Sequence, residues 1–411
     1  MLNVASYLHP NGSSIEGGMS EREWTLLITR IKSGECTPFL GAAASYPLLP
    51  LGGKIASDWA EKYDYPLQDS ENLPKVSQFM ALQFDPAFPK GAMRDYLQER
   101  LSLSSSVPNF DNKYQIHRVL AELPLPMYLT TNYDDFMSMA LTHAGKMDHV
   151  CDYCRWNAEL LEKPRKLLPD FDPTPGQPLV YHLHGILDEP ESIVVTEDDY
   201  IEFVRKIKPE DLPHRIVRAF AATSLLFLGH RLEDFSFRTV YKGLIDATSR
   251  VNRRQSISVQ LQPKSEAQKG IASNLEAIMN LARLMSKENA LHTEINARIG
   301  VIKAYLDENK VFSEINQLEG VLNNVAAAYD DAHQKEHALP ARELDIKMSH
   351  KVFNRFNILQ QTVKQLHRAE HALEFLREYF KQQNISIYWG DVHDFARELR
   401  DRCEKAGIIP S

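Results

Sequence analysis

The feature of this sequence that most constrains its fold is a series of short apolar segments that each stop at polar or glycine residues. The clearest lies in LPLPMYLTTNYDDFMSMAL, residues 123–141, where an apolar run gives way to Thr-Thr-Asn-Tyr-Asp-Asp and a helical pattern begins at once. Short apolar segments that end in this way are typical of the buried strands of a parallel sheet. The series therefore predicts an α/β fold.

The same pattern recurs along the chain. Strands are expected at Thr37–Leu40, Met127–Leu129, Leu179–Leu183, Leu225–Leu228, Ser256–Leu261 and Ile385–Trp389. Apolar residues at helical spacing predict an amphipathic helix from about residue 21 to 33, and a last helix is expected from about residue 394 to 405.

The sequence changes character after Pro263. Apolar residues recur at helical spacing over residues 295–306, 315–329 and 344–380, as in an antiparallel helical bundle. This spacing fits an internal core and an oligomer interface equally. Because strand-like sequence returns at Ile385, we expect a large helical region inserted before the last strand.

The expected organisation has four parts. They are a flexible N-terminal arm at 1–20, an α/β domain at 21–262, a helical region for oligomerisation or partner binding at 263–384, and a last strand and helix at 385–411 that return to the α/β domain.

Composition excludes several classes of protein. With 43% apolar and 25% charged residues among 411, the chain has the composition of a folded globular protein. A net charge of -8 gives no global attraction to nucleic acid. The N-terminal residues lack a signal peptide and no segment reaches membrane-spanning length, so a cytoplasmic protein without membrane contact is expected.

The cysteines give no zinc motif. Cys151 and Cys154 form a CxxC pair without a second pair in the sequence, whereas a structural zinc site normally has four ligands. A loop with two incidental thiols is expected here, and no zinc.

The strand ends carry the candidate site, because ligands of open parallel sheets bind at the carboxyl edge. Gly41 to Ser45 follows the first strand, where backbone N–H groups can hold a pyrophosphate. Asn132 follows the second with Thr130, Thr131 and Asp134 beside it. Its amide can hold a ribose hydroxyl or a water, although helix capping explains such residues equally well.

Two later strands end in histidine and glycine. His182 and His184 alternate onto one face, which suits a metal pair or two buried core histidines. If one is catalytic, His184 is preferred, because it is nearest the strand end and Gly185 lets a ligand approach. Gly229 and His230 end another buried strand, whereas residues 192–200 suggest a strand that leads into a helix cap.

Taken together, these segments resemble the sirtuin superfamily. GAAAS at 41–45 is similar to its phosphate loop, TTNYD at 130–134 to its Thr-x-Asn-x-Asp motif, and HG at 184–185 to its catalytic His-Gly. Longer stretches, LTTNYDDFMSMAL, YHLHGILDEPESIVVTEDDY and LLFLGHRLEDFSFR, look like the bacterial sirtuin-like proteins of antiphage defence. The resemblance covers residues 20–262 and the last strand and helix.

The resemblance implies a Rossmann-like parallel sheet flanked by helices that binds NAD⁺ as substrate and cleaves its nicotinamide–ribose bond. Asn132 would orient water and the ribose, and His184 would act as the base. Contacts to the dinucleotide would come from the other matching positions, which are Gly41, Ala42, Ser45, Thr131, Asp134, Gly185, Gly229 and His230.

Three departures from the family pattern bear on function. Ala43 replaces the second glycine of the phosphate loop, which predicts backbone that avoids positive φ or is strained. The zinc module of the protein deacylases is absent from the sequence, and the helical region has no counterpart in them. This architecture looks most like the partner of a HerA-type hexameric ATPase translocase, in which sirtuin-like subunits form a homo-oligomer.

Several functions remain open at this point. An NAD⁺ glycohydrolase that depletes NAD⁺ during phage infection is the leading hypothesis. The alternatives are a scaffold that senses NAD⁺ or ADP-ribose without turnover, a nuclease subunit of the ATPase complex, and a protein deacylase. Contact with nucleic acid is expected to be weak or indirect.

Overall fold

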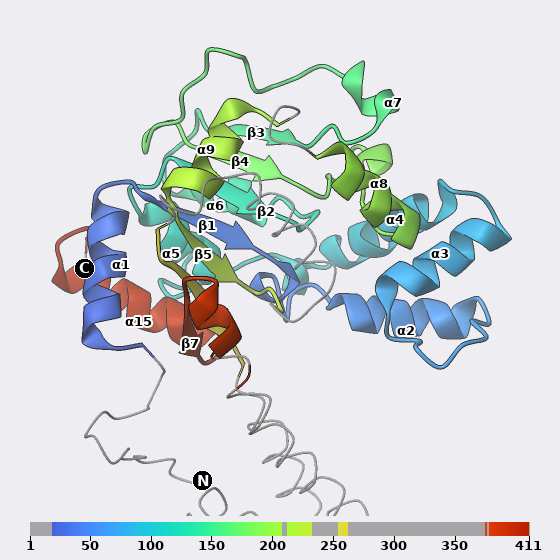
Figure 1. The fold of residues 1–411 in the computed structure, drawn as a ribbon, viewed down its shortest axis with the longest axis horizontal. Helices are drawn as coiled ribbons and strands as arrows, with labels where there is room; N and C mark the ends of the chain where they lie inside the picture. Colours follow the sequence, from blue (N-terminus) through green and yellow to red (C-terminus); the bar gives the residue numbers. More distant parts are fainter. Residues whose placement is uncertain (1–18, 208–211, 232–253, 262–374, 376–377, 411) are drawn as a thin grey trace, which may run out of the picture. The chain divides into compact units, whose positions relative to one another are not determined.

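The computed structural model describes residues 19–207, 212–231, 254–261, 375 and 378–410. Its centre is a seven-stranded sheet with the order β3-β4-β2-β1-β5-β6-β7, in which every pairing is parallel. The strands are β1 Cys36–Leu40, β2 Met127–Thr130, β3 Val150–Tyr153, β4 Leu179–His182, β5 Ser224–Leu228, β6 Ser256–Gln260 and β7 Ile385–Trp389. The Rossmann-like α/β fold expected from the sequence is confirmed (Figure 1).

The described helices are α1 Glu21–Lys32, α2 Gly52–Lys62, α3 Leu73–Gln83, α4 Phe88–Leu101, α5 Ile116–Glu122, α6 Phe136–His143, α7 Ala158–Leu161, α8 Glu197–Lys206, α9 His214–Ala222 and α15 Val392–Lys405. Short 3₁₀ turns occur at η1 Ala42–Ala44, η2 Ser104–Ser106 and η3 Pro190–Ser192. None of the described helices is long and apolar enough to cross a bilayer. The helical stripes predicted between residues 295 and 374 lie outside the described residues.

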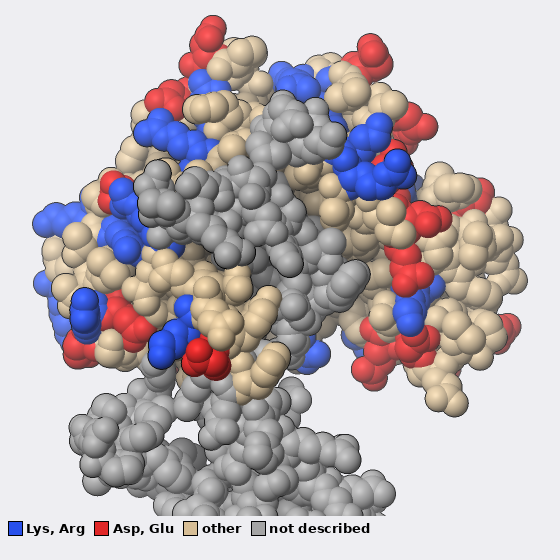
Figure 2. Space-filling view, viewed as in Figure 1, with Lys and Arg blue, Asp and Glu red and all other residues tan. Residues whose placement is uncertain are grey.

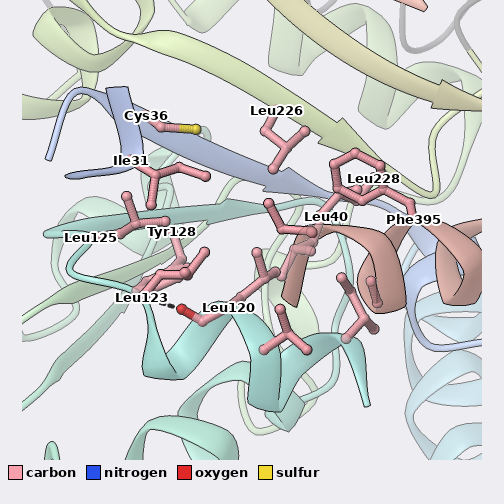
Figure 3. Close-up of a cluster of buried hydrophobic side chains, with 14 of the residues drawn as sticks. Ile31, Cys36, Leu40, Leu120, Leu123, Leu125, Tyr128, Leu226, Leu228 and Phe395 are labelled. Carbon is pink, nitrogen blue, oxygen red and sulfur yellow. Dashed lines mark hydrogen bonds between the residues drawn. The ribbon is translucent and has the colours of Figure 1, made fainter. Parts of the chain in front are cut away.

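One face of the sheet is covered by α1, α5, α6 and α15. Their apolar side chains and those of the strands form the main core, part of which Figure 3 shows. Tyr128 is completely buried within it, and its hydroxyl donates to the Leu120 carbonyl oxygen at 2.9 Å. This bond satisfies the one polar group that Tyr128 brings into the core.

α9 contacts the sheet through aromatic rings. The ring centroid of Phe39 in β1 lies 5.9 Å from that of Phe220 in α9, edge to face. It lies 5.7 Å from that of Phe227 in β5, with the two rings tilted. A second apolar cluster joins α2, α3 and α4 to the segment after β4, through residues such as Trp59, Met80, Ile193 and Val195. These contacts place α2 to α4 beside the carboxyl edge of β4.

Proline in central strand β1 has a consequence for pairing. Gly41 N–H donates to Leu228 O on β5, so by alternation Pro38 faces β2. Pro38 has no N–H, and the β1–β2 register begins only after it, at Phe39 and Leu129. Pairing of β1 with β2 is thereby concentrated at the carboxyl edge.

The last strand and helix lie against the first helix. β7 pairs with β6 over its whole length, and α15 packs Phe395 against Trp24 with their rings 5.5 Å apart. Arg402 of α15 donates to the carboxylate of Glu21 at 2.7 and 2.8 Å. The described residues up to Gln260 and from Phe380 onward thus belong to one compact unit.

Two local predictions were wrong. The CxxC segment lies in and directly after β3, where Asp152 forms a buried ion pair with Arg155 at 2.9 Å, so the expected loop is the outermost strand. Residues 193–196 pair in no ladder. The helix cap predicted after them is confirmed, because Thr196 and Asp199 form a capping box at the start of α8.

Charged side chains of both signs are interspersed over the face of the described residues in Figure 2. The acidic side chains of the described residues are therefore not gathered into one area on that face.

Candidate site at the carboxyl edge of the sheet

The predicted site residues gather at one edge because the strands that precede them are parallel and adjacent. β1, β2, β4 and β5 all end there, and the register pairs Thr130 of β2 with His182 of β4. Asn132 and His184 therefore lie equally far beyond the paired strands, two residues past each end.

The loop after β1 is a 3₁₀ turn held against β5. Gly41 N–H donates to Leu228 O at 2.8 Å and Ala43 N–H to Gly229 O at 3.1 Å. The amides of Ala44 and Ser45 donate back to Gly41 O and Ala42 O. These four amides are not available to a phosphate while the turn keeps this conformation.

Ala43 is accommodated without backbone strain. Among the described residues other than glycine, only Asp64 and Asn384 have positive φ. Ala43 lies inside the turn η1. Of the two conformations that the sequence left open at this position, the structure adopts the one that avoids positive φ.

Two glycines let the turn and the β5 end approach each other closely. Gly229 has φ +78°, and a Cβ atom there would lie 2.3 Å from the Ala44 amide nitrogen. A Cβ on Gly41 would lie 2.5 Å from Nδ1 of His230. The structure thus brings Gly41, Gly229 and His230 together, and only Ala42 of the turn is exposed.

Asn132 is fixed by a network that reaches across to the β1 turn. Its Nδ2 donates to Gly41 O and to Ser45 Oγ, both at 3.1 Å. Ser45 Oγ in turn donates to Oδ2 of Asp134 at 2.8 Å. The capping explanation is wrong for Asn132, because the N-cap of α6 is Asp135.

This network also fixes which way the Asn132 amide points. A carbonyl oxygen such as Gly41 O can only accept, so the atom that faces it must be the NH₂ nitrogen. Ser45 Oγ donates its one hydrogen to the hydrogen bond with Asp134, so it must accept the second hydrogen bond of Nδ2. The donors of the side chain are thus used by the protein, and Oδ1 remains as an acceptor.

The carboxyl group of Asp134 is buried at the base of this network. Burial raises its pKa, and the hydrogen bond from Ser45 opposes that shift. Thr131, by contrast, turns away from the network, since its N–H and hydroxyl both donate to Leu40 O, at 3.0 and 3.4 Å.

His184 is held by its backbone and by aromatic packing. Its carbonyl oxygen accepts from Val194 N–H at 3.0 Å. Its ring stands perpendicular to those of Tyr200 and Phe203, with ring centroids 5.4 and 5.1 Å apart. Its Nε2 has no hydrogen-bond partner in the described part of the chain. Burial lowers the pKa of His184 to about 3, so the imidazole is neutral.

The turn after His184 is tightly enclosed. Gly185 has φ +92°, and a Cβ atom there would lie 2.2 Å from the carbonyl oxygen of Ser192. Trp156 Nε1 donates to that same oxygen at 2.8 Å. Gly185 is therefore required by the protein's own backbone, whatever ligand approaches it.

One residue of the edge was missed by sequence reasoning. Gln260 ends β6, and its Nε2 donates to His230 O at 2.7 Å. Gly390, after β7, donates to Gln260 O at 3.0 Å. The rule applied to the other strands, a polar residue where an apolar run stops, could have found Gln260.

Burial and the nearby His184 lower the pKa of His230.

Nδ1 of His182 is used within the protein. Nδ1 of His182 is bonded to Asn132 O at 2.9 Å. Within the described ranges, no group of three or more His, Cys, Asp or Glu side chains could hold a metal ion.

Comparison with known proteins agrees with this architecture. The model of the SIR2-like domain matches residues 126–282, a range that begins just before β2. The β1 turn lies before that range, and the structure brings it into contact with Asn132.

Three similar proteins are each named NAD(+) hydrolase ThsA. The one from Enterococcus faecium is 33% identical over 98 residues, which are 23% of this chain and 18% of that protein. Those from Cytobacillus dafuensis and Acinetobacter baumannii are each 28% identical, over 31% and 29% of this chain and 24% and 22% of theirs. The chain thus covers less than a quarter of the length of these relatives.

Proposed function

We propose that this chain, which carries a SIR2-like domain, is an NAD⁺ glycohydrolase that releases nicotinamide and ADP-ribose. The observation that supports the proposal is that two side chains with a hydrogen-bond acceptor left for a ligand lie at the same edge of the sheet. Asn132 is fixed with Oδ1 as its remaining acceptor. His184, two residues beyond the strand paired with β2, has a neutral imidazole with an unpartnered Nε2. The names of the similar proteins support the same reaction.

These two side chains suit hydrolysis of an N-glycosidic bond. When that bond breaks, nicotinamide leaves with the bonding electrons and C1′ of the ribose becomes an oxocarbenium-like centre. Water then adds to C1′ and loses a proton. Asn132 Oδ1 accepts a hydrogen bond from the water or a ribose hydroxyl and so orients it, and His184 takes the proton.

The base strength of His184 depends on how its ring is solvated. A pKa of about 3 makes a buried imidazole a weak base. Entry of substrate and water beside Tyr200 and Phe203 restores polar surroundings and raises that pKa toward the ordinary value of about 6.5. Catalysis therefore requires this aromatic enclosure to open on the side of Nε2.

The remaining edge residues complete the proposed substrate site. Gly41, Ala42 and Ser45 contact the dinucleotide phosphates after a shift of the turn that keeps Gly41 O and Ser45 Oγ bonded to Asn132. Thr131, Asp134 and Gly185 border the ribose of nicotinamide, and Gly229 and His230 border the adenosine.

The proposed biological setting is antiphage defence by NAD⁺ depletion in the cytoplasm. The chain would act as a homo-oligomer bound to a HerA-type ATPase. This part rests on the resemblance of the motifs and on the order of the segments. Co-expression with a HerA-type ATPase, followed by size-exclusion chromatography, tests the assembly: separate elution of the two proteins would contradict it.

Asn132→Ala tests the reaction. Turnover should fall by about 100-fold or more, the usual effect of losing a group that positions the nucleophile. The control is Asn72→Ala, which removes a side chain that caps α3 by accepting from Lys75 N–H. That change should cost about 1 kcal/mol of stability and leave nicotinamide release intact. Equal loss of turnover in both variants would contradict the role of Asn132.

A second function is favoured by one observation. Ala43 replaces the second glycine of the phosphate loop, a departure from the sirtuin pattern that is compatible with a site that senses ADP-ribose or NAD⁺ without turnover. Calorimetric titration with ADP-ribose, run beside the turnover assay, separates the two functions. Binding without nicotinamide release under any condition would establish the sensor.

A further inference from the structure

We propose that His182 is a positioning residue for this reaction, since it holds the peptide of Asn132 and thereby directs the Asn132 side chain. The inference deepens the proposed function and rests on it. It concerns a residue that the substrate itself need not touch.

The hydrogen bond of His182 shows which of its ring nitrogens carries the hydrogen. The residue is 2% exposed at the carboxyl end of β4, and its Nδ1 lies 2.9 Å from the carbonyl oxygen of Asn132. Because that oxygen can only accept, Nδ1 carries the hydrogen and donates. The ring is therefore fixed in one tautomer by the residue that it holds.

Asn132 needs such support because it lies beyond the sheet ladder. β2 ends at Thr130, and the β2–β4 register ends with the pair Thr130 and His182. Past that point, Asn132 N–H donates to Thr130 Oγ1 at 2.9 Å, and Asn132 O accepts from His182. Side chains of the last paired residues thus replace the missing ladder bonds at Asn132.

The side-chain end of Asn132 is held separately. Its Nδ2 bonds Gly41 O and Ser45 Oγ, which belong to the β1 turn. Loss of the His182 bond would leave those contacts in place but free the peptide to rotate about them. The direction of Oδ1 then becomes variable, and a displacement of about 1 Å at such a group can cost about 100-fold in rate.

A purely structural buried histidine would have the same burial, so the test must separate donor position from packing. His182→Asn keeps an NH donor at the place of Nδ1, His182→Gln moves it outward to the place of Nε2, and His182→Leu removes it. If His182 positions Asn132, kcat should fall by about tenfold or more in the Leu and Gln variants. His182→Asn should recover most of that loss, while KM for NAD⁺ changes little in all three.

Thermal unfolding of the same variants separates a positioning role of His182 from a packing role. His182→Asn leaves a larger void than His182→Gln or His182→Leu, so it should be no more stable than they are. If kcat follows thermal stability across the three variants, with Asn the least active, His182 has only a packing role and the inference is overturned.

NMR spectroscopy tests the positioning role of His182 without measuring turnover. The side-chain NH₂ resonances of Asn132 are observed in protein labelled with ¹⁵N at asparagine and assigned by their loss in Asn132→Ala. They should shift or broaden in His182→Leu and His182→Gln and return to their native position in His182→Asn. Failure of the native protein to release nicotinamide defeats the proposed reaction alone, whereas unchanged resonances in all His182 variants defeat the positioning role.

Discussion

At the scale of single residues, the two central side chains of the edge are held in opposite ways. Asn132 is fixed at both its peptide and its amide by hydrogen bonds. His184 is placed by its backbone and by aromatic edges, and its Nε2 bonds to no atom of the described residues. Since burying an unpaired polar nitrogen costs free energy, this placement suits a group whose partner is a ligand.

Substitution of His184 separates binding from chemistry. His184→Ala should abolish nicotinamide release, because the proton acceptor is gone, while ADP-ribose still binds. The control is His214→Ala, at an exposed histidine that begins α9, which should keep full turnover. Calorimetry with ADP-ribose and an assay of nicotinamide give the two readouts. Retained turnover in His184→Ala would remove this residue from the mechanism.

The candidate residues could be found from the sequence, but their arrangement could not. Asn132, His184 and Gly229 each follow an apolar run, and the rule for parallel strands places them at one edge. The bonds that orient Asn132 join residues 91 and 87 positions apart in the chain. No local pattern carries that information, and so the capping explanation could not be excluded from sequence.

At the scale of elements, the β1 turn and the β5 end form one interlocked unit. Ala43 N–H donates to Gly229 O, and Gly229 leaves no room for a Cβ atom beside the amide of Ala44. Six of the seven described strands were predictable, since they are short apolar runs that end in polar or glycine residues. β3 was missed because its sequence, Val-Cys-Asp-Tyr, is interrupted by an aspartate whose ion pair with Arg155 satisfies the buried charge.

Alanine substitution at three glycines measures this interlock. Gly229 combines positive φ with a close contact, Gly145 has φ +81° with open space around it, and Gly176 has open space alone. Gly176→Ala should be nearly neutral, and Gly145→Ala should cost about 1 kcal/mol for the left-handed backbone. Gly229→Ala should cost clearly more, because the Ala44 amide must also move. Urea unfolding tests this order, which equal losses at Gly145 and Gly229 would contradict.

At the scale of the whole molecule, buried neutral histidines link folding to pH. Burial lowers the pKa of His117 to about 4 and that of His184 to about 3. The unfolded chain binds protons at these residues below a pH of about 6.5, whereas the folded chain does not. Their contribution is therefore complete above that pH and is lost as the pH falls toward the folded values. Asp134, whose pKa is raised by burial, opposes this trend.

Stability should consequently fall between pH 7 and pH 5, by on the order of 2 kcal/mol for each such histidine. His117→Gln, a change in α5, should reduce the loss of stability between pH 7 and pH 5 by the contribution of this one histidine. Free energies of unfolding from urea titrations at several pH values provide the measurement. An unchanged slope in His117→Gln would show that this histidine titrates normally in the folded protein.

The central claim is that the edge assembled by β1, β2, β4 and β5 hydrolyses NAD⁺. The purified protein is incubated with NAD⁺, alone and together with a HerA-type ATPase, and nicotinamide and ADP-ribose are quantified by chromatography. Equimolar release of both products is expected in at least one of these states, and release about 100-fold slower or less from Asn132→Ala. Absence of nicotinamide in both states, from protein that still binds ADP-ribose, would contradict it.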